Sequence, residues 1–221
     1  MTNQYIVCSI HTDSGKTVTT TLLYDYLKDK LQVSPKIIKP IQTGPIKDTE
    51  MYTKWKVPQE KIGNFYSFQT AASPHIACKL EQQAIHFDDL FAYSHALRLK
   101  EPALIFELAG GLYTPINDNQ FMIDFIEALQ IPVILVMNNY LGSINHSLLT
   151  IQALQQKKIP IQGFVYNHTD QDTKFSEEMC HIIQKTTKIP LIGEIPYITN
   201  LENQFTSENI RKKIYQAWCL P

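Results

Sequence analysis

Short apolar runs alternate with longer amphipathic stretches along this chain. Several of the runs are apolar nearly throughout, as strands that are buried on both faces of a parallel sheet should be. They predict six strands, over residues 5–9, 36–39, 103–107, 132–137, 163–166 and 191–195.

Between these runs, apolar residues recur with the period of an α-helix. Leu148, Ile151 and Leu154 share one stripe, and the neighbouring glutamines lie off it. Residues 18–21, from Val18 onward, are β-branched and form helices poorly, but the loop before them requires a helix. The pattern predicts helices over residues 16–31, 87–99, 121–129, 144–156 and 175–186, and a last one over 207–218.

The alternation of strands and helices predicts an α/β fold, with a doubly wound, mostly parallel sheet and helices on both faces. No repeat, low-complexity tract or linker interrupts the pattern, so residues 1–221 are expected to form a single domain. Residues 40–83 are the least regular region and are expected to carry ligand-binding loops.

The composition excludes several classes of protein. A net charge of −1, with both signs interspersed, predicts no binding of nucleic acid or of an anionic membrane. The N-terminus has no basic segment followed by an apolar core, and no apolar run approaches the roughly 20 residues of a membrane helix. We therefore expect a soluble, cytoplasmic protein. Its four cysteines form no C-x-x-C pair or zinc-ligand spacing, and we expect reduced thiols.

Residues 9–17, Ser-Ile-His-Thr-Asp-Ser-Gly-Lys-Thr, follow the first predicted strand and open the first predicted helix. This is the setting of a Walker A loop, G-x-x-x-x-G-K-[ST]. Backbone N–H groups of Asp13, Ser14 and Gly15 would cradle phosphates with the help of the helix dipole. Lys16 would reach the β- and γ-phosphates, and the Thr17 hydroxyl would bind Mg²⁺.

The first glycine of the Walker A pattern is replaced by Ser9. A chance G-K-T at a helix start is therefore the alternative, and the strand-loop-helix setting favours the Walker A loop. By itself the motif supports a P-loop NTPase type of fold that binds a nucleotide or another phosphate.

Four more segments lie at the ends of predicted strands. They are K-P-I-Q-T-G at residues 39–44, E-L-A-G-G at 107–111, L-G-S-I-N-H at 141–146 and G-E-I-P at 193–196. Ligands of an open α/β sheet bind beyond the carboxyl ends of its strands. We therefore expect these segments to meet the phosphate loop and to bring Lys39 and Glu107 close to it.

Taken together, the segments resemble the motifs of the dethiobiotin synthetase family, which closes the ureido ring in biotin biosynthesis. The family pattern is G-T-D-T-x-x-G-K-T, K-P-x-x-[ST]-G, a following Asp, S-P-H, E-G-A-G-G, L-G-x-I-N-H, an Asn after the next strand, and G-E-I-P. Ser9, Ile10, His11 and Leu108 depart from it. The matching positions, in the same order, are 12–17, 39–44, Asp48, Ser73-Pro74-His75, 107–111, 141–146, Asn167 and 193–196.

The resemblance implies an ATP-dependent ligase that acts on 7,8-diaminopelargonic acid, CO₂ or bicarbonate, and ATP. One amine would attack CO₂ to give a carbamate, ATP would phosphorylate the carbamate, and the second amine would displace phosphate to close the cyclic urea. The resemblance also implies Mg²⁺ and a homodimer.

The same resemblance implies roles for single residues. Lys16 would bridge phosphate and carbamate oxygens, Lys39 would bind the carbamate, and Thr12 would hydrogen-bond the reacting groups. Mg²⁺ would be held by Thr17, Asp48 and Glu107, the nucleotide also by Asn167 and Pro196, and the substrate by Thr43, Gly110 and, across the dimer interface, Gly142, Ile144 and Asn145.

Each role has a plainer alternative. Asp48 and Asn145 are also suited to capping a helix, and residues 73–75 to a turn before one. Glu107 is equally a candidate structural acid, and Lys39 a solvated surface lysine. The short tail after residue 196 does not match the family, which predicts loose purine selectivity.

Three other functions remain open on the motifs alone. A partitioning-type ATPase switch carries an additional lysine early in the phosphate loop, where this chain has Ile10 and His11. A P-loop amidoligase carries a glutaminase domain, for which 221 residues leave no room. A small-molecule kinase is disfavoured by the L-G-S-I-N-H segment.

Overall fold

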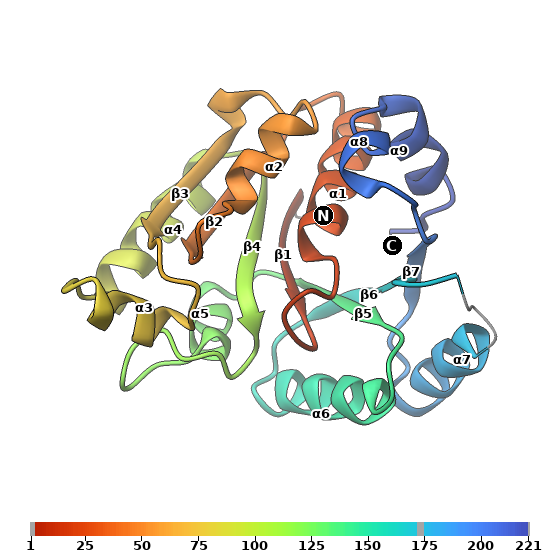
Figure 1. The fold of residues 1–221 in the computed structure, drawn as a ribbon. Coiled ribbons are helices and arrows are strands. Elements are labelled where there is room, and N and C mark those ends of the chain that lie inside the picture. The colour runs from red at the N-terminus through yellow and green to blue at the C-terminus, as the bar shows by residue number, and fades with distance from the viewer. Residues whose placement is uncertain (1–2, 172–174, 221) are drawn as a thin grey trace.

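The computed structural model describes residues 3–171 and 175–220, which fold around one seven-stranded sheet (Figure 1). The strands are β1 (Asn3–Ser9), β2 (Lys36–Gln42), β3 (Ile62–Ser67), β4 (Ala103–Gly111), β5 (Val133–Asn138), β6 (Ile161–Asn167) and β7 (Leu191–Ile195). Their spatial order is β3-β2-β4-β1-β5-β6-β7, and every described pair of neighbours is parallel. The predicted α/β fold is confirmed, with parallel pairing throughout the described sheet.

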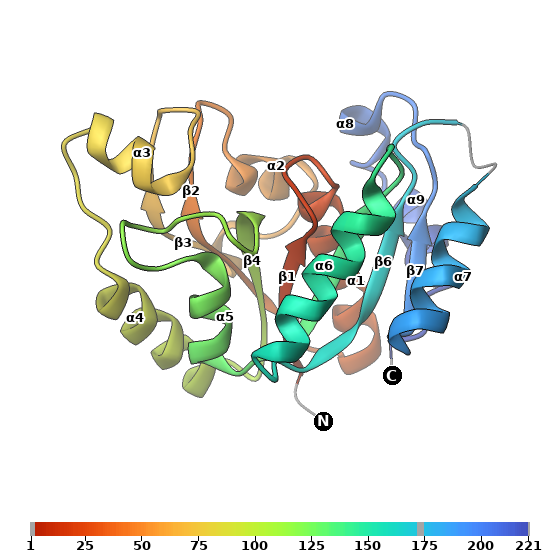
Figure 2. The same ribbon diagram turned by 90° about the horizontal axis from the view of Figure 1, so that it is seen from below.

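Helices cover both faces of the sheet (Figure 2). Successive side chains of β1 point to opposite faces, so Ile6 and Cys8 join one core and Tyr5 and Val7 the other. The first core is completed by α3 (Pro74–Leu80), α4 (Phe87–Lys100), α5 (Met122–Leu129), α6 (Ser143–Gln156) and α7 (Ser176–Thr187). The second is completed by α1 (Lys16–Leu31), α2 (Asp48–Lys54), α8 (Leu201–Gln204) and α9 (Glu208–Tyr215).

Two strands run further than the hydrophobic pattern predicts. β2 continues to Gln42 and β4 to Gly111, so Lys39 and Glu107 lie inside strands. Pro40 has no N–H to donate to a neighbouring strand. β2 pairs with β4 only up to Ile38, however, so the proline does not interrupt that ladder.

The expectation of irregular loops over residues 40–83 is wrong in part. The region contains α2, a short 3₁₀ helix η1 (Gln59–Lys61), β3 and α3. β3 is an edge strand with half-buried or exposed side chains, so it lacks the continuous apolar run of a central strand. α2 and α3 have only seven residues each, too few to show a helical period.

The last helix is shorter than the predicted 207–218. α9 ends at Tyr215 and packs along α1, the helix that follows the phosphate loop (Figure 1). The buried Arg211 pairs its Nε with Asp25 Oδ2 at 2.5 Å, and the Tyr215 hydroxyl donates to Asp29 Oδ2 at 2.7 Å. These contacts fasten the C-terminal segment to α1.

The residues after α9 cover the edge of β7. Trp218 lies against Gly193, where a Cβ atom would stand only 2.1 Å from the indole ring. The Cys219 N–H then donates to the Ile192 carbonyl at 2.8 Å. The tail thus continues the hydrogen bonding of the sheet beyond its last strand.

All four cysteines are free thiols, as expected. Cys8, Cys78 and Cys180 are buried, and Cys219 is exposed. Within residues 3–171 and 175–220, no helix is long and apolar enough to span a membrane.

Candidate active site

The phosphate loop connects the end of β1 to the start of α1, the strand-loop-helix setting that the sequence predicts. Gly15 caps α1 with a φ of 94°, in the left-handed region that favours glycine. A Cβ atom at Gly15 would also meet the Asn167 side chain at 2.2 Å. The Asn167 amide donates to the Ser14 carbonyl at 3.0 Å. The end of β6 therefore holds the loop from one side.

Lys16 turns back into the loop that precedes it. Its Nζ donates to Ser9 Oγ at 2.9 Å and to the His11 carbonyl at 3.2 Å. Burial, followed by the nearby Lys39 ammonium, lowers the pKa of Lys16 to about 8, although Glu107 acts in the opposite direction. Part of the Lys16 population therefore loses its charge just above neutral pH.

Beside Lys16, two carboxylates and a second lysine form a compact cluster. Lys39 Nζ lies 2.7 Å from Asp48 Oδ2 and 2.7 Å from Glu107 Oε1. The Thr17 hydroxyl lies 3.0 Å from Asp48 Oδ1 and 3.1 Å from Glu107 Oε1. Glu107 is fully buried, and the Tyr52 hydroxyl donates to its other oxygen.

Electrostatics bind this cluster together. Burial acts to lower the pKa of Lys39, but Glu107 and Asp48 outweigh it and raise that pKa above its usual value. Burial likewise acts to raise the pKa of Asp48, and the Lys39 ammonium reverses the direction. Lys39 and Asp48 therefore both stay charged at neutral pH.

The donor set of the cluster fits a hard cation. Thr17, Asp48 and Glu107 supply hydroxyl and carboxylate oxygens from three different elements, and Mg²⁺ prefers such ligands. The cluster has only two such carboxylates, and no group of three or more His, Cys, Asp and Glu side chains assembles anywhere among the described residues.

A cavity of about 480 Å³ opens over the cluster. It brings together most of the residues that the sequence predicts for chemistry, from the phosphate loop, β2 and β4. The predicted residues in its lining are Thr12, Asp13, Gly15, Lys16, Thr17, Lys39, Thr43, Asp48, Glu107 and Gly110.

Two predicted groups lie outside this cavity. Asn167 and Pro196 line a neighbouring hollow of about 300 Å³, which reaches the loop at Asp13 and Gly15. Gly142 and Ile144 border a third hollow of about 540 Å³ at the start of α6, and the neighbouring Asn145 is exposed. Within one chain, the start of α6 is therefore separate from the Lys39 cluster.

Several of the plainer alternatives can be judged directly. Lys39 is only 3% exposed, so the solvated-lysine alternative is wrong. The capping alternatives for Asp48 and Asn145 are also wrong, because Lys47 and Gly142 hold the N-cap positions of α2 and α6. Ser73 does lie just before α3, as the turn alternative expects.

Sequence reasoning missed Tyr52, although a signal was present. Asp48 and Tyr52 stand four residues apart in α2, which places their side chains on one face of the helix. Leu108, which departs from the family pattern, buries its side chain in the core.

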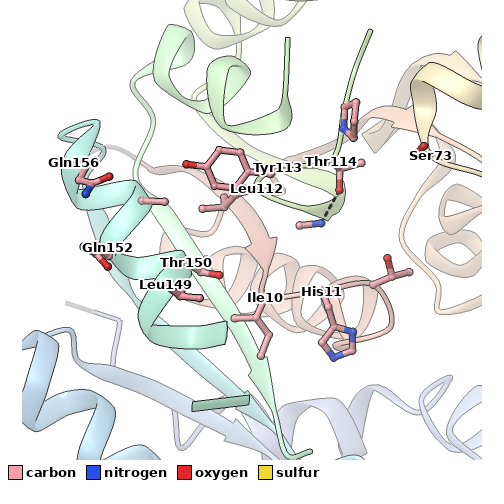
Figure 3. Close-up of a pocket in the computed structure, with 14 residues that line it drawn as sticks. Ile10, His11, Ser73, Leu112, Tyr113, Thr114, Leu149, Thr150, Gln152 and Gln156 are labelled. Atoms are coloured by element: carbon pink, nitrogen blue, oxygen red, sulfur yellow. Dashed lines mark hydrogen bonds between the residues drawn. The ribbon is translucent and has the colours of Figure 1, made fainter. Parts of the chain in front are cut away.

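A larger cavity of about 750 Å³, also missed, adjoins the first at Thr12 (Figure 3). Its walls come from Ile10 and His11, from the turn after β4, and from the second half of α6. Thr114 Oγ1 accepts a hydrogen bond from the Gly111 N–H at 3.0 Å and holds the turn. Ile10 and His11 belong to the phosphate loop, but no motif marks residues 112–115 or the second half of α6 in the sequence.

Comparisons with known proteins identify the relatives of this chain. A family model described as an AAA domain matches residues 3–205. The ATP-dependent dethiobiotin synthetase BioD of Lysinibacillus sphaericus is 36% identical, over 95% of this chain and 95% of its own length. The BioD of Halalkalibacterium halodurans is 31% identical, over 97% of this chain and 93% of its own.

Among solved structures, a ParA family ATPase from Chlorobium tepidum superposes with a TM-score of 0.61 over 96% of this chain and 92% of its own. The superposition demonstrates a common fold only, because the two sequences are just 12% identical. The sequence relatives carry the assignment, and the resemblance drawn from the motifs is confirmed. The chain belongs to the dethiobiotin synthetase family and is an ATP-dependent ligase of biotin biosynthesis.

Proposed function

We propose that this ligase converts 7,8-diaminopelargonic acid, CO₂ and ATP to dethiobiotin through a carbamate and a phosphorylated carbamate. One amine adds to CO₂ and loses a proton, which gives the carbamate. A carbamate oxygen then attacks the γ-phosphorus, and ADP leaves. The second amine attacks the carbamoyl carbon, loses a proton and expels inorganic phosphate, which closes the five-membered urea.

The convergence of two lysines with Thr17, Asp48 and Glu107 in one cavity is the observation that carries this proposal. Every step gathers negative charge on a few oxygen atoms, and phosphoryl transfer depends mainly on positioning and on stabilising such charge. Lys16, at the start of α1, would bind phosphate oxygens. Lys39, inside β2, would bind the carbamate.

Mg²⁺ held by Thr17, Asp48 and Glu107 would neutralise charge on the phosphates. A cation there competes with Lys39 for the same two carboxylates, since Lys39 lies 2.7 Å from each. Lys39 would then give up part of its ion pairing and be able to donate to the carbamate. Thr12 and Thr43, which line the same cavity, would hydrogen-bond the reacting groups.

The nucleotide base would occupy the hollow that Asn167 and Pro196 line. One hydrogen-bond donor of the Asn167 amide is already directed to the Ser14 carbonyl, which leaves less of this side chain to discriminate between bases. Purine selectivity should therefore be loose, and a strong preference for ATP over GTP in turnover would contradict this part of the proposal.

The carboxylate end of the substrate would be bound by Gly142, Ile144 and Asn145 of a partner subunit in a homodimer. The start of α6 offers free backbone N–H groups and a partial positive charge. Ile144 and Asn145 are exposed and lie outside the Lys39 cavity, so a second subunit is needed to bring them to it. We also propose that residues 1–221 act as one nucleotide-binding and ligase domain.

The first experiment is a turnover assay with the diamine, bicarbonate, Mg²⁺ and ATP, with dethiobiotin detected by mass spectrometry. Lys39→Ala should make almost no product. Lys36→Ala is the matched control, because Lys36 lies on the same strand, is partly exposed and does not line the cavity. Product from Lys39→Ala at the wild-type rate would remove Lys39 from the chemistry. ATP hydrolysis without product, unaffected by the diamine, would favour the ATPase-switch alternative.

Oxygen labelling tests the intermediate. If a carbamate oxygen attacks the γ-phosphorus, then CO₂ labelled with ¹⁸O must leave one labelled oxygen in inorganic phosphate and one in the urea carbonyl. Phosphate without label would exclude a phosphorylated carbamate. The label must be followed within seconds of mixing, before CO₂ exchanges its oxygens with water.

A further inference from the structure

The two oxygens of the Glu107 carboxylate face different surroundings. Oε1 lies 2.7 Å from Lys39 Nζ and 3.1 Å from the Thr17 hydroxyl, and all three residues line the cavity of about 480 Å³. Oε2 accepts a hydrogen bond from the hydroxyl of Tyr52. Tyr52 is fully buried and, among the described residues, is not part of the cavity lining. Glu107 therefore presents one oxygen to the cavity and keeps the other in the core.

The position of Tyr52 is fixed by its helix and by the core. It lies in α2, four residues after Asp48, and its ring packs in the core that α1 and α2 complete with the sheet. Asp48 Oδ2 in turn lies 2.7 Å from Lys39 Nζ, so α2 supplies both a carboxylate of the cluster and the hydroxyl behind it. If Glu107 turned both oxygens to the cavity, it would leave the Tyr52 hydroxyl buried without this acceptor, which costs free energy.

Divalent cations differ in what they take from a carboxylate. Mg²⁺ is small and demands near-octahedral geometry, whereas the larger Ca²⁺ takes more oxygen ligands and accepts both oxygens of one carboxylate. We propose that Tyr52 is a positioning residue that restricts Glu107 to one oxygen and thereby favours Mg²⁺ over Ca²⁺ at the cluster of Thr17, Asp48 and Glu107. Tyr52 acts through Glu107 and makes no contact with the cation itself.

Tyr52→Phe keeps the ring in the core and removes only the hydroxyl. Glu107 Oε2 then loses its donor, so turning both oxygens to the cavity no longer costs a hydrogen bond. Partners that orient a metal ligand are typically worth about tenfold or more in metal affinity. The ratio of the Ca²⁺ to the Mg²⁺ dissociation constant should therefore fall about tenfold, through weaker Mg²⁺ binding and unchanged or tighter Ca²⁺ binding.

The test measures cation binding directly and needs no turnover. Mn²⁺ is the probe, because free Mn²⁺ gives an electron paramagnetic resonance signal that is lost on binding. It is titrated into the complex of the intact protein with ADP, with protein in excess and no diamine, and is then displaced by Mg²⁺ or by Ca²⁺. Tyr52→Met, which also lacks the hydroxyl, is the second variant. Tyr166→Phe is the matched control, since Tyr166 is also fully buried, donates its hydroxyl to Met179 Sδ at 3.4 Å and belongs to the core on the other face of the sheet.

An unchanged ratio in both Tyr52 variants would overturn the inference, and so would an equal loss of affinity for both cations, which is what a purely structural role produces. The inference rests on the proposed magnesium site, and Asp48→Asn tests that site separately by weakening Mn²⁺ binding. If Asp48→Asn leaves Mn²⁺ binding unchanged, the cation lies elsewhere and both proposals fail. If it weakens Mn²⁺ binding and the Tyr52 variants keep the wild-type ratio, only the role of Tyr52 fails.

Discussion

At the scale of single residues, Lys39 is a buried cation that two carboxylates keep charged. Such a group costs free energy to desolvate, and the paired charges repay that cost only while the cluster is complete. The motifs could predict that Lys39, Asp48 and Glu107 lie at one edge of the sheet. They could not predict the ion pair between Lys39 and Glu107, because a contact between side chains 68 residues apart follows from packing.

Glu107→Gln should lower both stability and activity. The substitution leaves Lys39 paired with Asp48 alone and puts an amide against the Tyr52 hydroxyl, so we expect a loss of about 3 kcal/mol in the free energy of unfolding. Urea denaturation measures it. Glu101→Gln is the control, since Glu101 is part-exposed and 3.7 Å from Lys36, and should cost under about 1 kcal/mol. Equal losses in the two variants would show that the cluster adds no special stability.

Burial and the Lys39 ammonium lower the pKa of Lys16 to about 8. Nucleotide affinity should therefore fall as the pH rises through that value. Below this pH Lys16 keeps its proton and attracts phosphate, and above it the attraction is lost. The ADP dissociation constant should then rise by up to about tenfold per pH unit, the limit for one proton. Titrations between roughly pH 7 and 9.5 measure it.

A guanidinium stays charged throughout this range, so Lys16→Arg should remove most of the pH dependence, whatever its effect on affinity. The same slope in the wild type and in Lys16→Arg would mean that another group titrates.

At the scale of elements, the central strands and long helices were predictable because they bury continuous faces. The edge strand β3 was not predictable, because its side chains are half-buried or exposed and its sequence lacks a continuous apolar run. The ends of β2 and β4 were also missed, because Lys39 and Glu107 are charged residues inside buried strands, and such residues are kept there only by partners that the pattern does not display.

The contact between α9 and α1 should be a large contribution to stability. Arg211→Ala leaves the mostly buried Asp25 without its cation, and we expect a cost of about 3 kcal/mol in urea denaturation. The neighbouring Lys212 is half exposed and 3.6 Å from Asp29, so Lys212→Ala should cost under about 1 kcal/mol. If Arg211→Ala lowered the free energy of unfolding no more than Lys212→Ala, the ion pair with Asp25 would contribute little to the packing of α9 on α1.

At the scale of the whole molecule, the proposed site is complete only in a dimer. In the proposed two-fold dimer, two equivalent sites would each take Lys39 from one subunit and Asn145 from the other. The sequence alone could suggest this division through the family resemblance. It could not show that the start of α6 is exposed, with Leu141 fully accessible and the Lys39 cavity elsewhere.

Mixing two inactive variants should therefore restore activity. Lys39→Ala and Asn145→Ala, refolded or co-expressed together, form mixed dimers with one intact site and one doubly altered site. Random pairing gives about a quarter of wild-type activity. Each variant alone, assayed at the same total concentration, is the control. If native mass spectrometry shows mixed dimers and the mixture still has no activity, both residues of a site lie in one subunit.

The tail that covers β7 decides how this protein should be handled. Trp218 fills the space over Gly193 and Cys219 is hydrogen-bonded to Ile192, so the chain remains part of the fold almost to its end. A purification tag fused at the C-terminus would loosen the contacts of Trp218 and Cys219 with β7. The edge of β7 would then be open to pairing with another chain, which promotes aggregation. The exposed Cys219 thiol lies at the same edge and adds a route to oxidative cross-linking on storage. A tag at the N-terminus and a reducing buffer keep that edge closed.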